Sequence, residues 1–211
     1  MCWKTPIPGL GWSSPVIVGS KVFLTTAVPQ EGDDEPHNLQ LVCVDLTDGH
    51  IQFATTLFEQ QGPVQMHKKN SHASPTPLVR NGRVYVHFGP QGTACTTLNG
   101  KPVWKQTLSY KPVHGNGGSP VLVGDTLVIA CDGSDEQYVV GLDSANGEVR
   151  WKTARDTSPP KGFSFTTPLV LPAAISGADR DQVICPGSDA VFAYDPATGE
   201  TIWRFDYPGG Y

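Results

Sequence analysis

The sequence lacks the features that mark several common classes of protein. No stretch places apolar residues at helical spacing for long enough to predict a helix, and no apolar run approaches membrane-spanning length. Charged residues make up only 17% of the chain, and the net charge of -5 argues against nucleic acid or an acidic membrane face as partner. No signal peptide is visible, since residues 1–4 lead straight into a predicted strand. These absences favour a turn-rich β protein.

Several chemical signatures are also missing. The five cysteines form no adjacent pair and no Cys-x-x-Cys, which predicts buried free thiols rather than disulfides. There is no Gly-x-Ser-x-Gly nucleophile elbow. The glycine-rich segment 114–118 leads into a predicted strand, so it lacks the helix terminus that holds phosphate. The sequence therefore contains no complete catalytic constellation.

What the sequence does contain is a repeat. Aromatic residues recur at intervals of 50, 51, 47 and 52 positions, at Trp3, Phe53, Trp104, Trp151 and Trp203. Self-similarity with a period of about 40–50 residues is typical of propeller blades. The repeat predicts the fold more clearly than the function.

Two anchors define each repeat. The first is Ser or Thr followed by Pro and an apolar run, at 14–18, 76–79, 119–123 and 167–171. The second is a turn that ends on the aromatic residue, at 45–53, 143–151 and 195–203, with a shortened copy at 98–104. We expect the Asp of this turn to bond backbone amides and its Gly to adopt the left-handed conformation that closes a bulged hairpin.

Each repeat is predicted to form four short antiparallel strands. The expected first strands are 14–18, 75–79, 119–123 and 167–171, and the second strands are 21–27, 83–88, 126–131 and 181–186. The third strands are 39–45, 93–98, 138–143 and 190–195, and the fourth are 50–56, 101–107, 148–154 and 200–206. The chain is thus predicted to be all-β, a single propeller segment over 1–211 with blades at about 12–56, 74–107, 117–154 and 165–206. Residues 2–6 are expected to be the outer strand of a preceding blade.

With this repeat, the chain resembles the pyrroloquinoline-quinone (PQQ) repeat propellers. The pattern Asp-x-x-x-Gly-x-x-x-Trp at 143–151 and 195–203 carries the resemblance, with Phe53 a mild departure. The resemblance implies that the five aromatics are docking residues, each packed against a neighbouring blade. It is closer to the non-enzymatic outer-membrane assembly lipoproteins than to full quinoprotein dehydrogenases. It implies a periplasmic or secreted protein, although the chain without a signal peptide would be cytoplasmic if it is the full-length product.

Relatives of this kind have seven or eight blades, so the four predicted here leave three alternatives. The chain is a fragment or has a wrongly assigned gene start. It is a half-propeller, of which two copies form an eight-bladed ring as a homodimer. Or it closes on itself as a four-bladed ring, which leaves the strand at 2–6 surplus.

The candidate site lies in loops that lead into first strands or join second to third strands, because these gather at one mouth of a propeller channel. The candidate ligand-binding residues are His67, Asn70, His72, His114, Asn116 and Asp132. Neutral imidazoles could bind a metal or accept protons, but the spacing of His67 and His72 is no zinc signature, so no metal is predicted. The alternative is that these histidines only satisfy backbone groups in turns.

The predicted function is a non-catalytic scaffold that binds a protein or small ligand through these loops. The alternative is a fragment of a PQQ-dependent quinoprotein dehydrogenase, an oxidoreductase. That resemblance would imply a calcium ligand set of Glu, Asn and Asp, a Trp beneath the quinone and, in many members, a disulfide between adjacent cysteines. No such cysteine pair exists here, and we expect no cofactor.

Overall fold

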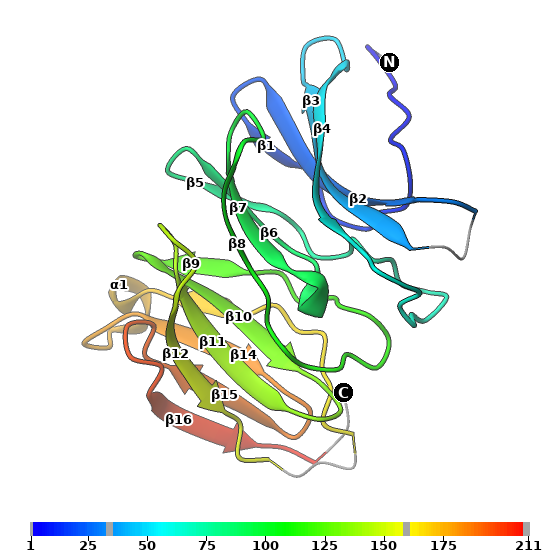
Figure 1. The fold of residues 1–211 in the computed structure, drawn as a ribbon. Helices are drawn as coiled ribbons and strands as arrows, with labels where there is room; N and C mark the ends of the chain where they lie inside the picture. Colours follow the sequence, from blue (N-terminus) through cyan, green and yellow to red (C-terminus); the bar gives the residue numbers. More distant parts are fainter. Residues whose placement is uncertain (1, 33–35, 158–160, 209–211) are drawn as a thin grey trace. The chain divides into compact units, whose positions relative to one another are not determined.

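The computed structural model describes residues 2–32, 36–157 and 161–208 (Figure 1). Within these residues the chain forms four sheets, each of four antiparallel strands, which confirms the predicted all-β propeller-blade fold. In every sheet the strands are hydrogen-bonded in chain order, from the first strand to the fourth. The repeat of the sequence is thus a repeat of sheets.

The strand bounds agree with the sequence prediction to within three residues. The first sheet contains β1 (Val16–Val18), β2 (Lys21–Pro29), β3 (His37–Asp45) and β4 (Ile51–Glu59). The second contains β5 (Leu78–Arg80), β6 (Arg83–His87), β7 (Thr93–Thr97) and β8 (Pro102–Gln106). The third contains β9 (Val121–Val123), β10 (Thr126–Asp132), β11 (Gln137–Asp143) and β12 (Val149–Ala154). The fourth contains β13 (Leu169–Leu171), β14 (Gln182–Pro186), β15 (Ala190–Tyr194) and β16 (Thr201–Asp206).

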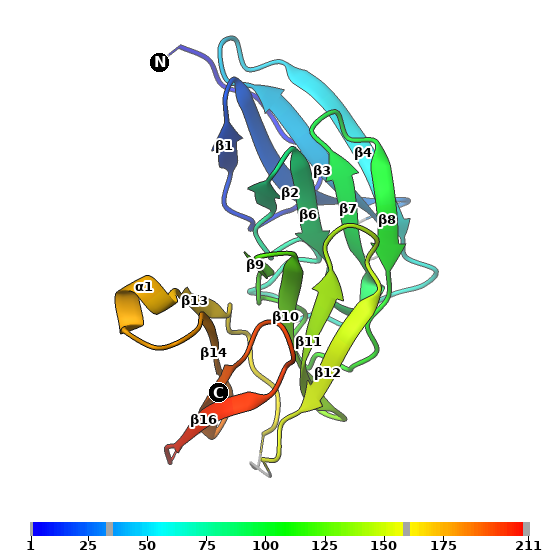
Figure 2. The ribbon, with the colours of Figure 1, turned by 90° about the vertical axis from the view of Figure 1, so that its left-hand side faces the viewer.

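The chain divides into two compact units. Unit 1 comprises residues 1–107 and 114–116 and holds the first two sheets, while unit 2 comprises residues 108–113 and 117–211 and holds the last two. Figure 2 shows the sheets of each unit from a second side. The core of unit 1 includes Phe23, Leu41 and Phe88, and that of unit 2 includes Val139 and Tyr194. That all four sheets form one segment remains a prediction.

The turn between third and fourth strands has the chemistry that its sequence predicts. In the first sheet, the backbone N–H of Thr47 donates to Asp45 Oδ1 at 2.8 Å, and Gly49 has a φ of +79°. The fourth sheet repeats this, since the Ala197 N–H donates to Asp195 at 2.8 Å and Gly199 has a φ of +75°. Beside each turn the strand register shifts by one residue, as in a bulged hairpin.

The repeated aromatics cover these glycines. The Trp151 indole N–H donates to the Pro196 carbonyl at 3.0 Å, and a Cβ added to Gly199 would lie 2.5 Å from the indole. Trp3 covers Gly49 in the turn of the first sheet in the same way, and its indole N–H donates to the Leu46 carbonyl at 2.9 Å. Glycine is therefore required twice over, by its positive φ and by the ring against it.

The other three aromatics differ in their surroundings. Phe53 covers Gly100, whose added Cβ would lie 2.6 Å from the ring. Trp104 is buried, whereas Trp203 is 38% exposed and donates to Gln182 within its own sheet at 2.8 Å. That all five serve as the docking positions of the family stays a prediction.

The Ser/Thr-Pro anchor joins neighbouring sheets within each unit. The backbone N–H of Ser14 donates to the Thr76 hydroxyl at 3.1 Å, and that of Ser119 donates to Thr167 at 3.0 Å. The hydroxyl at one anchor thus satisfies a backbone donor that lies just before the first strand of the previous sheet.

Three local features differ from the sequence prediction. A one-turn helix, α1 (Ala173–Ser176), and a 3-10 turn at Gly89–Gln91 occur where no helix was predicted. Residues 2–6 are not assigned to a strand, because no described strand pairs with them. Two findings concern the whole of the described chain. No helix among the described residues is long and apolar enough to cross a membrane. All five cysteines are free; four are buried as predicted, and Cys2 is exposed.

Candidate functional site

A loop of unit 1, residues 66–75 between β4 and β5, lies against the segment 114–116. The Asn70 side chain joins them, since its Nδ2 donates to the carbonyls of His114 at 2.8 Å and Asn116 at 3.3 Å. The rings of His67 and His114 meet edge to face, with centroids 5.1 Å apart. Four of the six predicted site residues are therefore gathered in one place: His67, Asn70, His114 and Asn116.

Asn70 also organises its own loop. Its Oδ1 accepts hydrogen bonds from the Ser71 backbone N–H at 2.9 Å and from the Ser74 hydroxyl at 2.5 Å. The Ser71 hydroxyl in turn accepts from the Ala73 N–H at 3.2 Å. Both ends of the Asn70 amide are thus committed, so this residue positions the loop and is not free to bind a ligand.

Gly115 permits the close approach. Its φ is +89°, and an added Cβ would lie 2.8 Å from Asn70 Nδ2 and 3.2 Å from the Met66 sulfur. A residue without a Cβ is therefore needed at this position. Here the close neighbour of the glycine is the Asn70 side chain.

His67 is the exposed member of the cluster. Its Nδ1 accepts a hydrogen bond from the Lys69 backbone N–H at 3.2 Å, which assigns the proton of the neutral ring to Nε2. The ring can therefore offer an N–H to an incoming carbonyl or carboxylate. Lys68 and Lys69, also exposed, add positive charge beside it.

His72 has different partners from the other site residues. Its ring lies against that of His37 in β3, with centroids 4.4 Å apart, and its Nδ1 accepts from Gln60 Nε2 at 3.1 Å. Burial and the neighbouring His37 lower the pKa of His72 to about 4. His72 is therefore neutral at pH 7 and fastens the base of the loop. Neither His37, the first residue of β3, nor Gln60, which directly follows β4, was among the predicted site residues.

Asp132 belongs to unit 2 and forms a buried ion pair there. Asp132 Oδ1 lies 3.0 Å from Arg155 Nε, and both side chains are 1% exposed. The Ser164 hydroxyl donates to Asp132 Oδ2 at 2.5 Å, and Arg155 Nη1 donates to the Cys185 carbonyl at 3.1 Å. Burial raises the pKa of Asp132 above its ordinary value, although Arg155 and Ser164 oppose this. Its carboxylate is thus already engaged.

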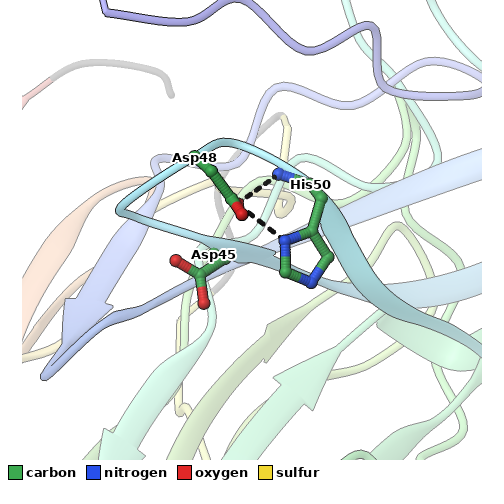
Figure 3. Close-up of side chains that lie close together, drawn as sticks. All are labelled: Asp45, Asp48 and His50. Atoms are coloured by element: carbon green, nitrogen blue, oxygen red, sulfur yellow. Dashed lines mark hydrogen bonds and ion pairs between the residues drawn. The ribbon is translucent and has the colours of Figure 1, made fainter.

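A second cluster occurs at the turn of the first sheet, where Asp45, Asp48 and His50 lie close together (Figure 3). Their potential ligand atoms lie within 4.8 Å of one another. However, Asp48 Oδ1 accepts from the His50 N–H at 3.0 Å and contacts His50 Nδ1 at 2.6 Å, and Asp45 accepts from Thr47 and Gln52. These bonds are those of the repeated turn, so we assign no metal site here.

The repeat of sheets, turns and aromatic contacts defines the chain as a PQQ-repeat β-propeller protein. A sequence model of the family described as outer membrane protein assembly factor BamB matches residues 1–167. The match covers well over half of the chain, which therefore belongs to this family. A search of curated proteins found no match.

Solved structures share the fold. The chain superposes on BamB from Moraxella catarrhalis with a TM-score of 0.51 at 17% identity, covering 92% of this chain and 62% of that one. A quinohemoprotein alcohol dehydrogenase from Pseudomonas putida HK5 gives 0.68 at 14% identity, covering 97% and 35%. A europium-containing methanol dehydrogenase gives 0.63 at 16% identity, covering 92% and 41%. The chain thus spans well under half the length of these dehydrogenases.

Proposed function

We propose that this chain is a non-catalytic PQQ-repeat scaffold that binds a protein partner through the loop 66–75 and the segment 114–116. The observation that carries the proposal is the Asn70 hydrogen-bond set, which fixes the loop while His67 remains exposed. Such a surface is preorganised for binding, so little conformational entropy is lost on contact. A small ligand that carries a carboxylate or carbonyl is the second occupant that the same groups would accept.

Membership of the family supports a cellular compartment and a process for this function. Its description names a factor of outer membrane protein assembly, so we propose that the chain acts outside the cytoplasm, in the periplasm, on proteins of that process. The site contains no nucleophile with an adjacent base, which supports binding rather than catalysis. Two copies, with eight sheets between them, would complete an eight-bladed ring; a solution mass twice that of the 22.6 kDa chain would support this homodimer.

The proposal is tested by site-specific photo-crosslinking in cells that produce the protein. A photoreactive residue replaces Lys68 in the loop or, as a control, Asn99 in the exposed turn between β7 and β8. We expect a discrete protein adduct from position 68 that disappears when Asn70→Ala is added. Equal adducts from both positions, or none from either, would count against a binding surface at the loop.

The second candidate function is part of a PQQ-dependent dehydrogenase. The observation that favours it is structural, since the dehydrogenase folds superpose with TM-scores of 0.63 and 0.68 against 0.51 for BamB. The candidate oxygen ligands for calcium do not fit this function, however, because they already have other partners. Asp132 is buried against Arg155, and Asn70 is fully committed to backbone and hydroxyl groups.

This alternative has its own test. PQQ and calcium are added to the purified protein, and the quinone absorbance is followed. We expect no shift at micromolar quinone. A saturable shift that Asp132→Asn abolishes would favour the dehydrogenase.

A further inference from the structure

Two histidine pairs hold the loop 66–75, and they differ in burial. The pair His67–His114 lies at the start of the loop on the exposed side. The pair His37–His72 lies near its end, and His37 is buried. Four of the six histidines of the chain are thus in ring contact within unit 1. In the pair His37–His72, the hydrogen bond from Gln60 to His72 Nδ1 forms only when that nitrogen carries no proton.

Burial and the neighbouring His37 both disfavour a positive charge on the ring of His72. His37 is the titratable group that faces its ring among the described residues, and a protonated His37 would repel it. Gln60 donates its Nε2–H to His72 Nδ1 and accepts the His37 backbone N–H at 3.0 Å through Oε1. An added proton on Nδ1 would face this donor, so protonation breaks the bond between His72 and Gln60.

Loss of the hydrogen bond between His72 and Gln60 affects the turn that contains His72. Residues 70–74 form a compact set in which Asn70 Oδ1 accepts from Ser71 and Ser74. His72 lies inside this set, two residues from the Asn70 side chain that bonds the His114 carbonyl at 2.8 Å. A displaced His72 therefore moves the turn that holds Asn70 in place.

We propose that His72, held neutral against His37 and Gln60, is an acid-sensitive latch that releases the loop 66–75 as the surroundings acidify. The latch concerns the conformation of the loop and would regulate binding if the proposed function is right. Closing is favoured above the ordinary histidine pKa of 6.5 and is lost as the pH falls towards the folded pKa of about 4. Because His72 is only partly buried, we discount this shift and expect loop opening to rise about 10- to 100-fold between pH 7.5 and 4.5.

Hydrogen exchange followed by mass spectrometry tests the latch on the full chain. Exchange rates are corrected for the intrinsic effect of pH, and peptides covering 66–75 are compared with those covering 126–143 in unit 2. We expect loop protection to fall about 10- to 100-fold at pH 4.5 while the unit 2 hairpin stays protected. In His72→Gln, which cannot gain a proton, we expect the loop to respond less than threefold.

Two controls separate this latch from other acid effects. His50→Gln removes an exposed histidine that is paired with Asp48, and it should leave the response of the loop unchanged. The acidic residues 33–35 precede His37 in the sequence and lie outside the described residues. Replacing them together by Asn, Asn and Gln should also leave the response unchanged.

Several outcomes would overturn the proposal: a loop that stays protected at pH 4.5, a wild-type response in His72→Gln, or loss of the response when residues 33–35 are neutralised. Should His72→Gln fail to fold, the ring of His72 is titrated by NMR in the wild type, and opening must follow that titration. An acid response without a crosslink at position 68 would leave the latch standing and remove only the binding function.

Discussion

The loops that lead into β5 and β13 hold equivalent places in their sheets, yet different chemistry fastens them. In unit 1 the loop 66–75 is held by neutral groups, chiefly the Asn70 amide and the Ser71 and Ser74 hydroxyls. In unit 2 Ser164, which precedes β13, is tied to the buried ion pair of Asp132 and Arg155. The loop of unit 1 therefore keeps exposed polar side chains, whereas in unit 2 the charged side chains of Asp132 and Arg155 are buried against each other. The repeat thus keeps the backbone path in both units, while the side chains that hold the loops differ.

The largest effect is expected from breaking the ion pair of unit 2. Arg155→Ala leaves Asp132 buried without its partner, which should lower the free energy of unfolding by about 3–5 kcal/mol in urea titrations. The double variant Asp132→Leu with Arg155→Met removes both charges and should be distinctly less destabilised than Arg155→Ala. A loss below about 1 kcal/mol in Arg155→Ala would mean that the pair does not hold unit 2 together.

Buried titratable groups in the two units should respond to acid with opposite effects on stability. His87 in β6 is 1% exposed, and burial lowers its pKa to about 3, so its contribution to stability is present above pH 6.5 and is lost as the pH falls towards 3. The raised pKa of Asp132 has the opposite sign, because protonation relieves the cost of its buried charge. At pH 4.5 we expect His87 to cost unit 1 about 2 kcal/mol.

The measurement is urea unfolding between pH 7 and 4.5 for the wild type and for His87→Gln, which keeps a polar group near Thr93 but cannot be protonated at this pH. The slope of stability against pH should be smaller in the variant. Parallel curves for the two proteins would show that His87 does not titrate on unfolding.

A smaller effect is expected at the unit 1 loop itself. Asn70→Asp keeps the acceptor for Ser71 and Ser74 but replaces the donor that faces the His114 carbonyl with a second oxygen. We expect a loss of about 1–2 kcal/mol in unfolding free energy. Asn99→Asp, at an exposed turn, is the matched control and should change stability by less than about 0.5 kcal/mol. Similar losses in both variants would mean that the Asn70 bonds do not matter.

The smallest effect is expected at the turn in Figure 3, which resembles a metal site only by proximity. His50→Ala removes one of its three candidate ligands. Zinc or calcium should raise the melting temperature of neither this variant nor the wild type, since the turn bonds already use the carboxylate oxygens. A metal-dependent rise in the wild type that His50→Ala removes would reverse this conclusion.

Much of the fold could be predicted because its signals are local. The hairpin at 45–53 needs only an Asp to bond the amide of Thr47 and a Gly at positive φ, and both are visible in the sequence. The helix α1 was missed because four residues after Pro172 carry no helical period. Residues 2–6 were predicted as a strand from their sequence pattern, although a strand also needs a partner, which a sequence pattern alone does not supply.

The candidate site was predicted less completely. Asn70 and His114 could be placed together because both precede first strands of neighbouring blades, and the structure brings them into contact. The partners of the other two residues could not be predicted. His72 meets His37, 35 positions earlier, and Asp132 meets Arg155, 23 positions later. Nothing in the local pattern marks either pair.

The number of sheets, the order of their strands and the turns that close them can be predicted from the sequence, because they follow from contacts between residues close along the chain. Which polar side chains remain available at the surface, in contrast, depends on the folded chain. Whether a histidine or aspartate is exposed or buried depends on distant residues that fold against it, and burial sets both its hydrogen-bond partners and its pKa. The same residue types therefore give an exposed surface in unit 1 and a closed ion pair in unit 2.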